Sequence, residues 1–189
     1  MRILAIQASP NEEGLTASMA KAAMQGAEAA GAEAELLQLC KLNLEVCRAC
    51  EQGWGQCRRE GTCIIEDDLA AVVDKMAGVD GIILSTPVYF GDVAEVVKTV
   101  FDRVRRCQFA GPGERRLEGK WMLGIAAAGG GGGGGATCLV AMERYYAHIG
   151  LRMLDQLIAT RRSRDYMLLA ARGSGEAMVR HIEEQGQGG

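Results

Sequence analysis

Four of the seven cysteines in this chain lie within one short segment, so thiol chemistry is the first expectation from the sequence. Their spacing is Cys47-x2-Cys50-x6-Cys57-x5-Cys63, and glycines stand between them at positions 53, 55 and 61. Such a density of thiols in a protein of a reducing compartment is more typical of metal binding or redox chemistry than of a disulfide framework. Thiolates favour iron–sulfur clusters and zinc as partners.

Three alternatives are open for this segment: an iron–sulfur cluster, a zinc site, and free thiols or a redox-active disulfide. Structural zinc sites usually pair two short knuckles across a longer spacer, whereas this segment has one Cys-x2-Cys pair and two wider gaps. That spacing argues against zinc. The remaining cysteines, Cys40, Cys107 and Cys138, lie in segments that predict strand or helix, and we expect them to be small buried hydrophobic side chains.

Glycines and hydroxyl residues mark three further segments that could hold a ligand. Seven consecutive glycines occupy residues 129–135, and residues 86–91 combine proline, aromatic side chains and glycine. Residues 8–16 offer the hydroxyls of Ser9 and Thr16 before a helix-forming stretch, a composition suited to an anion at a helix N-terminus. This segment has neither the nucleoside-triphosphate loop nor the dinucleotide fingerprint. The alternative is that Ser9 and Thr16 only cap the helix.

Alternating strands and helices must position these segments. Apolar runs and their punctuation predict strands at residues 3–6, 35–39, 81–85, 121–128 and 153–160, and helices at residues 16–30, 69–77, 94–105, 136–149 and 176–185. This alternation predicts an α/β fold, a flavodoxin-like doubly wound sheet of five parallel strands with helices on both faces. Ligands of such sheets bind outside the carboxyl ends of the strands, which is where residues 9–16, 86–91 and 129–135 are expected.

Several motifs, taken in order, carry a resemblance to a known family. They are Ala8-Ser9-Pro10-x3-Gly14-x-Thr16-Ala17, Asp67-Asp68, and Ser85-Thr86-Pro87-Val88-Tyr89-Phe90-Gly91 followed by Lys98 and Asp102-Arg103. Together they resemble the flavodoxin-like NAD(P)H-dependent FMN reductases over most of the chain. Because four cysteines precede the aspartate pair, the resemblance is nearest to the iron–sulfur flavoproteins of that family.

The resemblance implies an FMN site built from the three loops. The FMN phosphate would be held by Ser9, Asn11, Gly14, Thr16 and Ala17. The isoalloxazine ring would be lined by Pro87, Val88, Tyr89, Phe90, Gly91, Ala128, Gly129 and Gly130. No catalytic side chain is assigned, and Tyr89 is only a candidate for orienting the substrate. As alternatives, Tyr89 and Phe90 only pack the loop, and the glycine run is a loop that orders with a cofactor or a partner.

The same resemblance implies an iron–sulfur site whose spacing departs from the family. The family pattern is Cys-x2-Cys-x2-Cys-x5-Cys, which this chain keeps at both ends but extends in the middle by four residues within 51–56. Cys47, Cys50, Cys57 and Cys63 are therefore the candidate ligands of a [4Fe-4S] cluster. Arg48, Arg58 and Arg59 would offset the negative charge of four thiolates.

The implied function is an FMN-dependent oxidoreductase. It would take electrons from NAD(P)H or a ferredoxin and pass them to a quinone, a flavin, an oxygen species or another small acceptor. The alternatives are a non-enzymatic electron carrier of the flavodoxin type and a zinc-stabilised binding protein. The family is typically a homodimer or a homotetramer.

Composition sets the remaining limits. The 189 residues have a net charge of −3 and 48% hydrophobic residues, which fits one globular domain over residues 1–189 with a cysteine-rich insertion at 47–63. A mildly acidic chain is a poor nucleic-acid binder, and no apolar run is long enough to span a membrane. We therefore expect a cytoplasmic protein. Only residues 185–189 look like linker, and most arginines, among them Arg103, Arg105, Arg106 and Arg164, are expected on solvated faces or against NADPH phosphates or a partner subunit.

Overall fold

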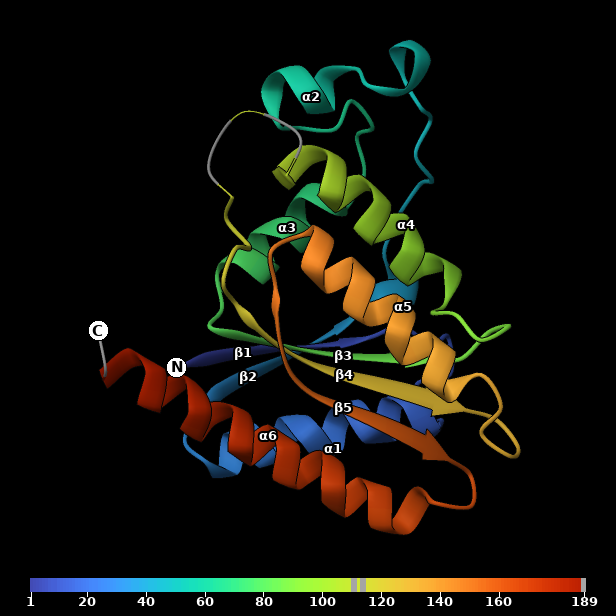
Figure 1. The fold of residues 1–189 in the computed structure, drawn as a ribbon, viewed down its shortest axis with the longest axis vertical. Helices are drawn as coiled ribbons and strands as arrows, with labels where there is room; N and C mark the ends of the chain where they lie inside the picture. Colours follow the sequence, from blue (N-terminus) through green and yellow to red (C-terminus); the bar gives the residue numbers. More distant parts are fainter. Residues whose placement is uncertain (110–111, 113–114, 188–189) are drawn as a thin grey trace.

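The computed structural model, which describes residues 1–109, 112 and 115–187, contains a five-stranded parallel sheet (Figure 1). Its strands are β1 (Arg2–Gln7), β2 (Glu33–Gln38), β3 (Gly81–Pro87), β4 (Trp121–Ala128) and β5 (Arg152–Thr160). They lie side by side in the order β2-β1-β3-β4-β5, and all neighbouring pairs are parallel. This is the strand order of flavodoxin-like doubly wound folds, as the sequence predicts.

Helices cover both faces of the sheet, which is why the central strands are continuous apolar runs. Helices α1 (Leu15–Ala29) and α6 (Arg164–Gln187) pack on one face, whereas α3 (Leu69–Ala77), α4 (Glu95–Val104) and α5 (Gly135–His148) pack on the other. Alternate residues of one strand therefore enter different cores. In β1, Leu4 and Ile6 belong to the core under α3, α4 and α5, while Ile3 and Ala5 belong to the core under α1 and α6.

The last helix is more than twice as long as the sequence predicts. The expected span was 176–185, but α6 begins at Arg164 and continues to Gln187, so residues 185–187 are helical rather than linker. The reason is packing. A Cβ on Gly26 would lie 1.9 Å from the carbonyl oxygen of Arg172, and one on Gly175 would lie 1.9 Å from that of Ala23. Glycine normally weakens a helix, but in this crossing Gly26 and Gly175 let α1 and α6 approach closely.

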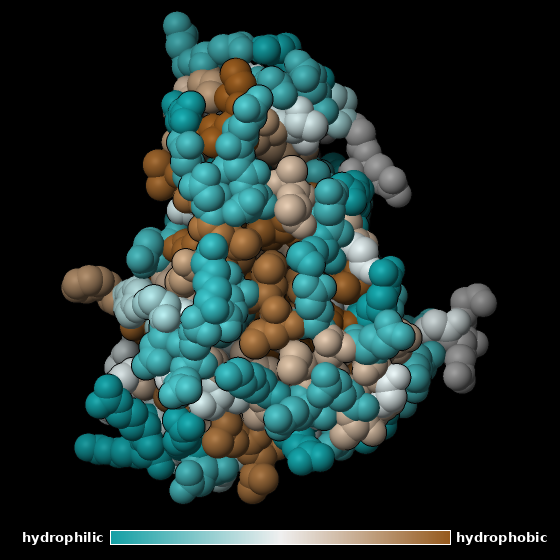
Figure 2. All heavy atoms as spheres, turned by 180° about the vertical axis from the view of Figure 1, so that it is seen from behind, coloured by the Kyte–Doolittle hydropathy of each residue, from teal (hydrophilic) through white to brown (hydrophobic). Residues whose placement is uncertain are grey.

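The cysteine-rich part lies at one end of the molecule, the upper end of Figure 1. It contains the short turn η2 (Glu51–Gly53) and the helix α2 (Gln56–Glu60), and it lies beside η3 (Arg105–Phe109), a π-helical turn that continues α4. A further short turn, η1 (Leu39–Lys41), follows β2 and precedes this part of the chain. Seen from behind, apolar atoms reach the surface at this end (Figure 2), and Val46 and Ile64 are among its exposed side chains.

In the part of the chain that the structure describes, no helix is both long enough and apolar enough to cross a bilayer.

Candidate functional site

The loops that follow β1 and β3 meet at the carboxyl edge of the sheet. The amide of Ala8 donates to the carbonyl oxygen of Ser85 at 3.0 Å, and the Ser85 hydroxyl donates to the carbonyl oxygen of Thr16 at 2.9 Å. Strand order reverses between β1 and β3, so this edge is the switch point at which doubly wound sheets bind ligands. The structure thus brings the first two predicted loops together.

The loop before α1 is shaped by its own side chains. Buried Gln7 donates from Nε2 to the Ser9 carbonyl oxygen at 2.7 Å, the amide of Asn11 donates to Ser9 Oγ at 3.1 Å, and the amide of Glu13 donates to Asn11 Oδ1 at 3.1 Å. Ser9 and Asn11 therefore form turns within the loop rather than helix caps.

Helix α1 begins at Leu15 without a capping side chain. Gly14 occupies the cap position, and no side-chain hydrogen bond closes the helix end. Thr16 and Ala17 follow in the first turn, both buried. The uncapped amides of such a turn are suited to an anion. The alternative that Ser9 and Thr16 only cap the helix is wrong.

Positive charge reaches this helix end from two sides. Arg164, the first residue of α6, donates from Nη2 to the hydroxyl of Ser18 at 2.9 Å. Lys41 forms a 2.7 Å ion pair with Glu12, and its hydrogen bond lowers the pKa of that exposed carboxyl group. The charge of one of the two glutamates in this loop is thereby offset, which lessens its repulsion of an anion at the α1 N-terminus.

The loop after β3 turns sharply and presents two aromatic side chains to solvent. Tyr89 and Asp92 exchange backbone hydrogen bonds of 3.0 and 2.9 Å. Between them Phe90 and Gly91 have φ angles of 52° and 79°, the pattern of a type I′ turn. Phe90 is fully exposed and Tyr89 is 42% exposed, so the alternative that these aromatics only pack the loop is wrong. A bulky residue in the left-handed region is strained, and such strain is characteristic of functional loops.

The glycine run meets this turn at Gly134 and is open around its first glycines. A Cβ on Gly134, where φ is 81°, would lie 2.7 Å from the Cα of Gly91, so only glycine lets the two loops approach. The Thr137 hydroxyl ties the same junction, with contacts of 2.8 Å to the carbonyl oxygen of Gly91 and 3.0 Å to that of Gly134. Around Gly129 and Gly130, by contrast, an added Cβ would meet no atom within 4 Å. Their backbone therefore faces free space, as contact with a flat ring requires.

The aspartate pair of the motif closes the base of the cysteine-rich segment. Asp68 accepts a hydrogen bond from the amide of Asn43 at 2.7 Å, and Asp67 accepts one from the amide of Glu45 at 2.8 Å. Asp67 also accepts from the amide of Leu69 at 3.1 Å, at the start of α3. We call the residues enclosed by these bonds, 46–66, the thiol loop.

A buried ion pair anchors the thiol loop to α4. Arg103 binds both carboxylate oxygens of Asp67 at 2.5 and 2.9 Å, and it also donates to the carbonyl oxygen of Glu45 at 2.9 Å and to Cys63 Sγ at 3.2 Å. Both side chains of the pair are inaccessible to solvent. The expectation that Arg103 lies on a solvated face is wrong, because Asp67 neutralises the guanidinium inside the protein.

Burial and pairing act in opposite directions on these two groups. Burial favours the neutral carboxylic acid of Asp67, but the hydrogen bonds from Arg103 and from the amides of Glu45 and Leu69 outweigh it, so the pKa of Asp67 lies below its usual value. Burial also lowers the pKa of Arg103, whereas Asp67 and Cys63 raise it to a net value above that of free arginine. Both groups are therefore charged at neutral pH.

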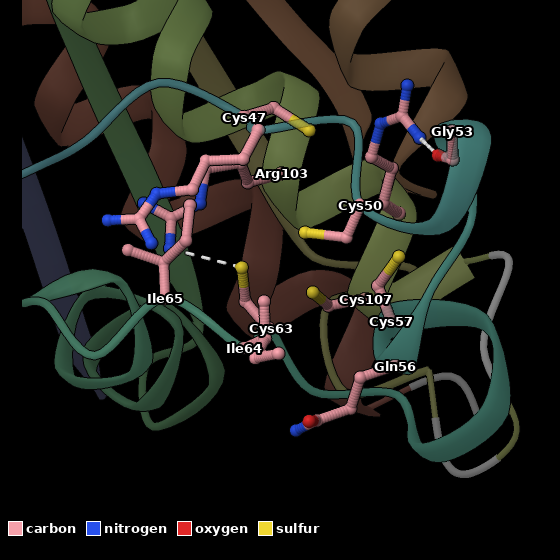
Figure 3. A pocket seen from close by; sticks show the side chains of 12 residues that line it. Cys47, Cys50, Gly53, Gln56, Cys57, Cys63, Ile64, Ile65, Arg103 and Cys107 are labelled. Carbon is pink, nitrogen blue, oxygen red and sulfur yellow. Dashed lines mark hydrogen bonds between the residues drawn. The ribbon is translucent and has the colours of Figure 1, made fainter.

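The four clustered cysteines face one small pocket that opens to solvent (Figure 3). We call it the thiol cavity. Cys47, Cys50, Cys57 and Cys63 line it, and so does a fifth thiol, Cys107. The charged side chains in its wall are Arg48, Arg103 and Arg106. Among the described residues, no three His, Cys, Asp or Glu side chains converge closely enough to hold a single metal ion.

Trp54 fixes the tip of the thiol loop against η3. The guanidinium carbons of Arg106 and Arg105 lie 4.5 and 5.4 Å from the centre of its ring, the geometry of cation–π contacts. Arg106 also donates a hydrogen bond to the carbonyl oxygen of Gly53. The sequence predicts Arg105 and Arg106 on a solvated face and so misses their contacts with the thiol loop.

The backbone around η2 is held in an unusual conformation. Ala49, Glu51 and Gln52 have φ angles of 47°, 51° and 64°, which non-glycine residues rarely adopt. These residues include the start of the stretch by which the chain departs from the family spacing. The extra residues thus form a distinct, strained turn rather than a simple extension of the loop.

The flavin-type loops and the thiol cavity lie at opposite ends of α4. This helix begins next to the loop after β3, where the amide of Ala94 donates to Thr86 Oγ1 at 3.0 Å. It continues into η3, which carries Cys107. With 10 residues, α4 separates the two regions by about 15 Å.

The sequence predicts the three loops and the four clustered thiols, but it does not predict correctly where each of the other cysteines lies. Cys40 was expected to be buried but lies exposed in η1, whereas Cys138 is buried as expected. Cys107 is buried too, but beside the other thiols rather than in an apolar core. Only its position near the end of an amphipathic helix could have signalled this, because the thiol loop and η3 are far apart in the sequence.

The chain is similar in sequence to curated iron–sulfur flavoproteins. It is 37% identical over 105 residues to an iron–sulfur flavoprotein of Methanocaldococcus jannaschii, covering 56% of this chain and 52% of the relative. It is 34% identical over 113 residues to one of Methanosarcina thermophila, covering 58% and 57%. The chain thus spans little more than half the length of these curated relatives, which belong to the branch that the sequence predicts.

Solved structures agree on the fold. An NAD(P)H:quinone oxidoreductase from Methanothermobacter marburgensis has a TM-score of 0.77 at 18% identity, covering 94% of this chain and 96% of its own. An archaeal flavodoxin has a TM-score of 0.66 at 11% identity, covering 97% and 99%. At these identities the likeness shows the fold alone.

The family itself is identified by a model described as NADPH-dependent FMN reductase, which matches residues 1–161. The chain therefore belongs to the NADPH-dependent FMN reductases, a family of flavin-dependent oxidoreductases.

Proposed function

We propose that this protein binds FMN at the carboxyl edge of its sheet and transfers electrons from NAD(P)H or a ferredoxin to a small acceptor such as a quinone or a flavin. We further propose that the thiol cavity holds an iron–sulfur cluster. The observation that carries the flavin assignment is the junction of the loops that follow β3 and β4, beside the β1/β3 switch point, where Gly91 and Gly134 meet in near contact. The carboxyl edge of the sheet is open beside this junction, around Gly129 and Gly130, so a flat ring could lie there.

The phosphate of FMN is assigned to the first loop. The uncapped amides at the start of α1 donate to an anion without a counter-charge, and the hydroxyls of Ser9 and Thr16 and the amide of Asn11 can add donors. Gly14 and Ala17 keep the approach free of bulky side chains. Arg164 lies close enough to α1 to favour negative charge there.

The ring of FMN is assigned to the two loops that meet at Gly91 and Gly134. Pro87 ends β3 and is followed by Val88, and Ala128 ends β4 and is followed by Gly129 and Gly130, so the backbone of both segments can approach the ring edge. Tyr89 and Phe90 are exposed and free to cover a ring face, and Tyr89 can orient a substrate through its hydroxyl. When bound, FMN supplies hydride and single-electron transfer.

The residues of the thiol cavity also fit the implied cluster. The resemblance assigns Cys47, Cys50, Cys57 and Cys63 as its ligands, and all four line the cavity. A four-iron cluster keeps its thiolates farther apart than one ion does, because each binds a different iron atom. The loose arrangement of sulfurs therefore suits a cluster better than zinc. The hydrogen bond from Arg103 to Cys63 stabilises a thiolate there.

An absorbance spectrum of anaerobically purified protein, with FMN, iron and zinc quantified, tests the assignment. We expect FMN and iron together, and steady-state NAD(P)H oxidation or reduced-ferredoxin oxidation with a quinone as acceptor. Flavin without turnover with either donor would leave only an electron carrier. Colourless protein with stoichiometric zinc would overturn the whole proposal.

Thr16→Val tests the phosphate loop directly. The loss of one hydrogen bond to a charged group costs about 1.5–3 kcal/mol, so FMN should bind roughly tenfold to a hundredfold more weakly. Thr99→Val, the same change on α4 away from the loops, is the matched control. Fluorescence titration of the FMN-free protein measures both affinities, and an unchanged affinity in Thr16→Val would contradict the phosphate assignment.

A further inference from the structure

The thiol cavity contains a cysteine that does not come from the thiol loop. Cys107 lies on η3, 44 residues after Cys63 in the sequence, and is only 7% exposed. Figure 3 shows its side chain in the same space as those of Cys50, Cys57 and Cys63. The chain thus offers five thiols to a site for which the family pattern provides four.

The backbone around Cys107 is specialised to present it. Helix α4 does not simply end at Val104 but continues as the π-helical turn η3. Such turns are rare and occur frequently at functional sites, because the wider turn redirects the side chains that follow. Here the turn places Cys107 in the wall of the thiol cavity.

The thiol loop is fastened to this turn, so the position of Cys107 relative to the other thiols is fixed. Arg105 and Arg106 flank the ring of Trp54, and Arg106 donates to the carbonyl oxygen of Gly53. These contacts join the thiol loop to η3 at the edge of the thiol cavity. The sulfur of Cys107 is therefore presented to the loop by a rigid element, as a ligand requires.

The electrostatic surroundings of Cys107 differ from those of the other buried cysteine, Cys138. Burial first, and then negative charge on Cys63 and Cys57, raises the pKa of Cys107 to about 12; Arg103 opposes this increase, and negative charge on Cys47 adds the smallest of these effects. Burial also raises the pKa of Cys138 to about 11, but the only charge that adds to this effect is Asp92. The two buried cysteines thus differ in one respect: Cys107 faces other thiols, whereas Cys138 lies in the core under α5.

The five sulfurs are not equivalent in their placement. In Figure 3 the sulfur of Cys47 is set apart from the other four, which lie around one space. The lengthened middle spacing offers a reason. The four extra residues are taken up by η2 and by the start of α2, so Cys57 is carried on α2 at the side of the cavity that η3 closes.

We propose that Cys107 is a ligand of the iron–sulfur cluster, together with Cys50, Cys57 and Cys63, and that Cys47 is the thiol in excess. This rests on the proposed cluster and changes its ligand set: the body of the fold supplies one ligand in place of the first cysteine of the loop. Each coordinating thiol releases its proton when it binds iron. The cluster would then join the thiol loop to α4 by a bond as well as by the Asp67–Arg103 pair.

Anaerobic reconstitution with ferrous iron and sulfide tests this assignment in wild type, Cys107→Ala, Cys107→Ser and Cys47→Ala. Iron and labile sulfide per chain, and the electron paramagnetic resonance (EPR) spectrum after dithionite reduction, are measured. We expect Cys107→Ala to lose the cluster, Cys107→Ser to lose it or show a shifted EPR signal from an oxygen ligand, and Cys47→Ala to keep the wild-type iron content. Cys138→Ala is the matched control for removal of a buried thiol, and should also keep it.

The outcomes separate this inference from the function on which it rests. If wild type and Cys107→Ala take up equal iron with the same EPR signal, or if Cys47→Ala loses the cluster while Cys107→Ala keeps it, Cys107 is not a ligand and the family set stands. If wild type takes up no iron, both the cluster and this assignment are overturned, while the flavin assignment is unaffected. FMN content and circular dichroism identify a variant that fails to fold, and the EPR signal of Cys107→Ser then decides.

Discussion

At the scale of single residues, the Asp67–Arg103 pair is the contact on which the thiol loop most depends. It joins four parts of the chain, because Arg103 also reaches Glu45 and Cys63. Removing one partner of a buried pair leaves the other charge without compensation, which is far more costly than losing a pair on the surface.

Asp67→Asn should therefore destabilise the protein by about 3–5 kcal/mol, since Arg103 would remain charged and buried. Urea unfolding monitored by circular dichroism measures the change. Asp102→Asn is the matched control: it removes the exposed Lys98–Asp102 pair next to Arg103 and should cost at most about 0.5 kcal/mol. Equal losses of unfolding free energy in the two variants would contradict the larger contribution that we assign to the buried pair.

The same pair makes stability depend on pH in a defined direction. The folded-state pKa of Asp67 is lowered, so its contribution is fully present above the unfolded-state pKa, about 3.9. That contribution is lost as the pH falls through the lower, folded-state pKa. Wild type should thus lose stability between about pH 4 and more acid values more steeply than Asp67→Asn. If the stability of wild type and of Asp67→Asn fell in parallel as the pH is lowered, Asp67 would not be the cause of the pH dependence.

At the scale of elements, the crossing of α1 and α6 depends on two glycines that meet the partner helix's backbone. Gly175 lies in this crossing, whereas Gly173, two residues earlier in α6, has free space around it. One type of substitution should therefore have opposite effects at two neighbouring positions.

Gly175→Ala should destabilise the protein, because its Cβ would lie 1.9 Å from the carbonyl oxygen of Ala23 and force the helices apart. Gly173→Ala should stabilise it by about 0.5–1 kcal/mol, the usual gain on replacing a glycine inside a helix. Thermal unfolding of both variants gives the two signs. A shift of the same sign in both would show that helix propensity, not the close approach, governs α6.

At the scale of the whole molecule, α4 separates two sites that should be disturbed independently. Gly134→Ala places a side chain at a φ of 81° and against Gly91, which should cost at least about 1–2 kcal/mol and weaken FMN binding. The iron content should remain that of wild type. Gly131→Ala, in open space on the same loop, should change neither. A parallel loss of iron in Gly134→Ala would show that the two sites are coupled.

The sequence predicts the architecture well because its signals are local. Five apolar runs and their punctuation are enough to derive the strands, and the order of motifs places three loops at one edge. The start of α6 is missed because Gly173, Ser174 and Gly175 resemble a helix break when α1 is not in view. Contacts across the chain override that local preference.

The candidate site, too, can be predicted from the sequence only where it depends on local signals and on strand order. Loops that follow adjacent strands come together by topology, so the flavin-type edge follows from the strand order. The burial of Arg103 depends on Asp67, 36 residues away, and the position of Cys107 depends on a π-helical turn that no pattern in this sequence marks. Such long-range partners cannot be derived from composition or periodicity.

The position of Trp54 beside two guanidinium groups has an optical consequence. The chain has two tryptophans, and the other one, Trp121, lies at the start of β4 with its ring 4.4 Å from that of His181. Indole emission responds to nearby charge and is quenched by neighbouring groups that absorb light. A Trp121→Phe variant therefore carries one indole, which contacts Arg106 in the wall of the thiol cavity. Its fluorescence should follow the filling and emptying of that cavity without an added label.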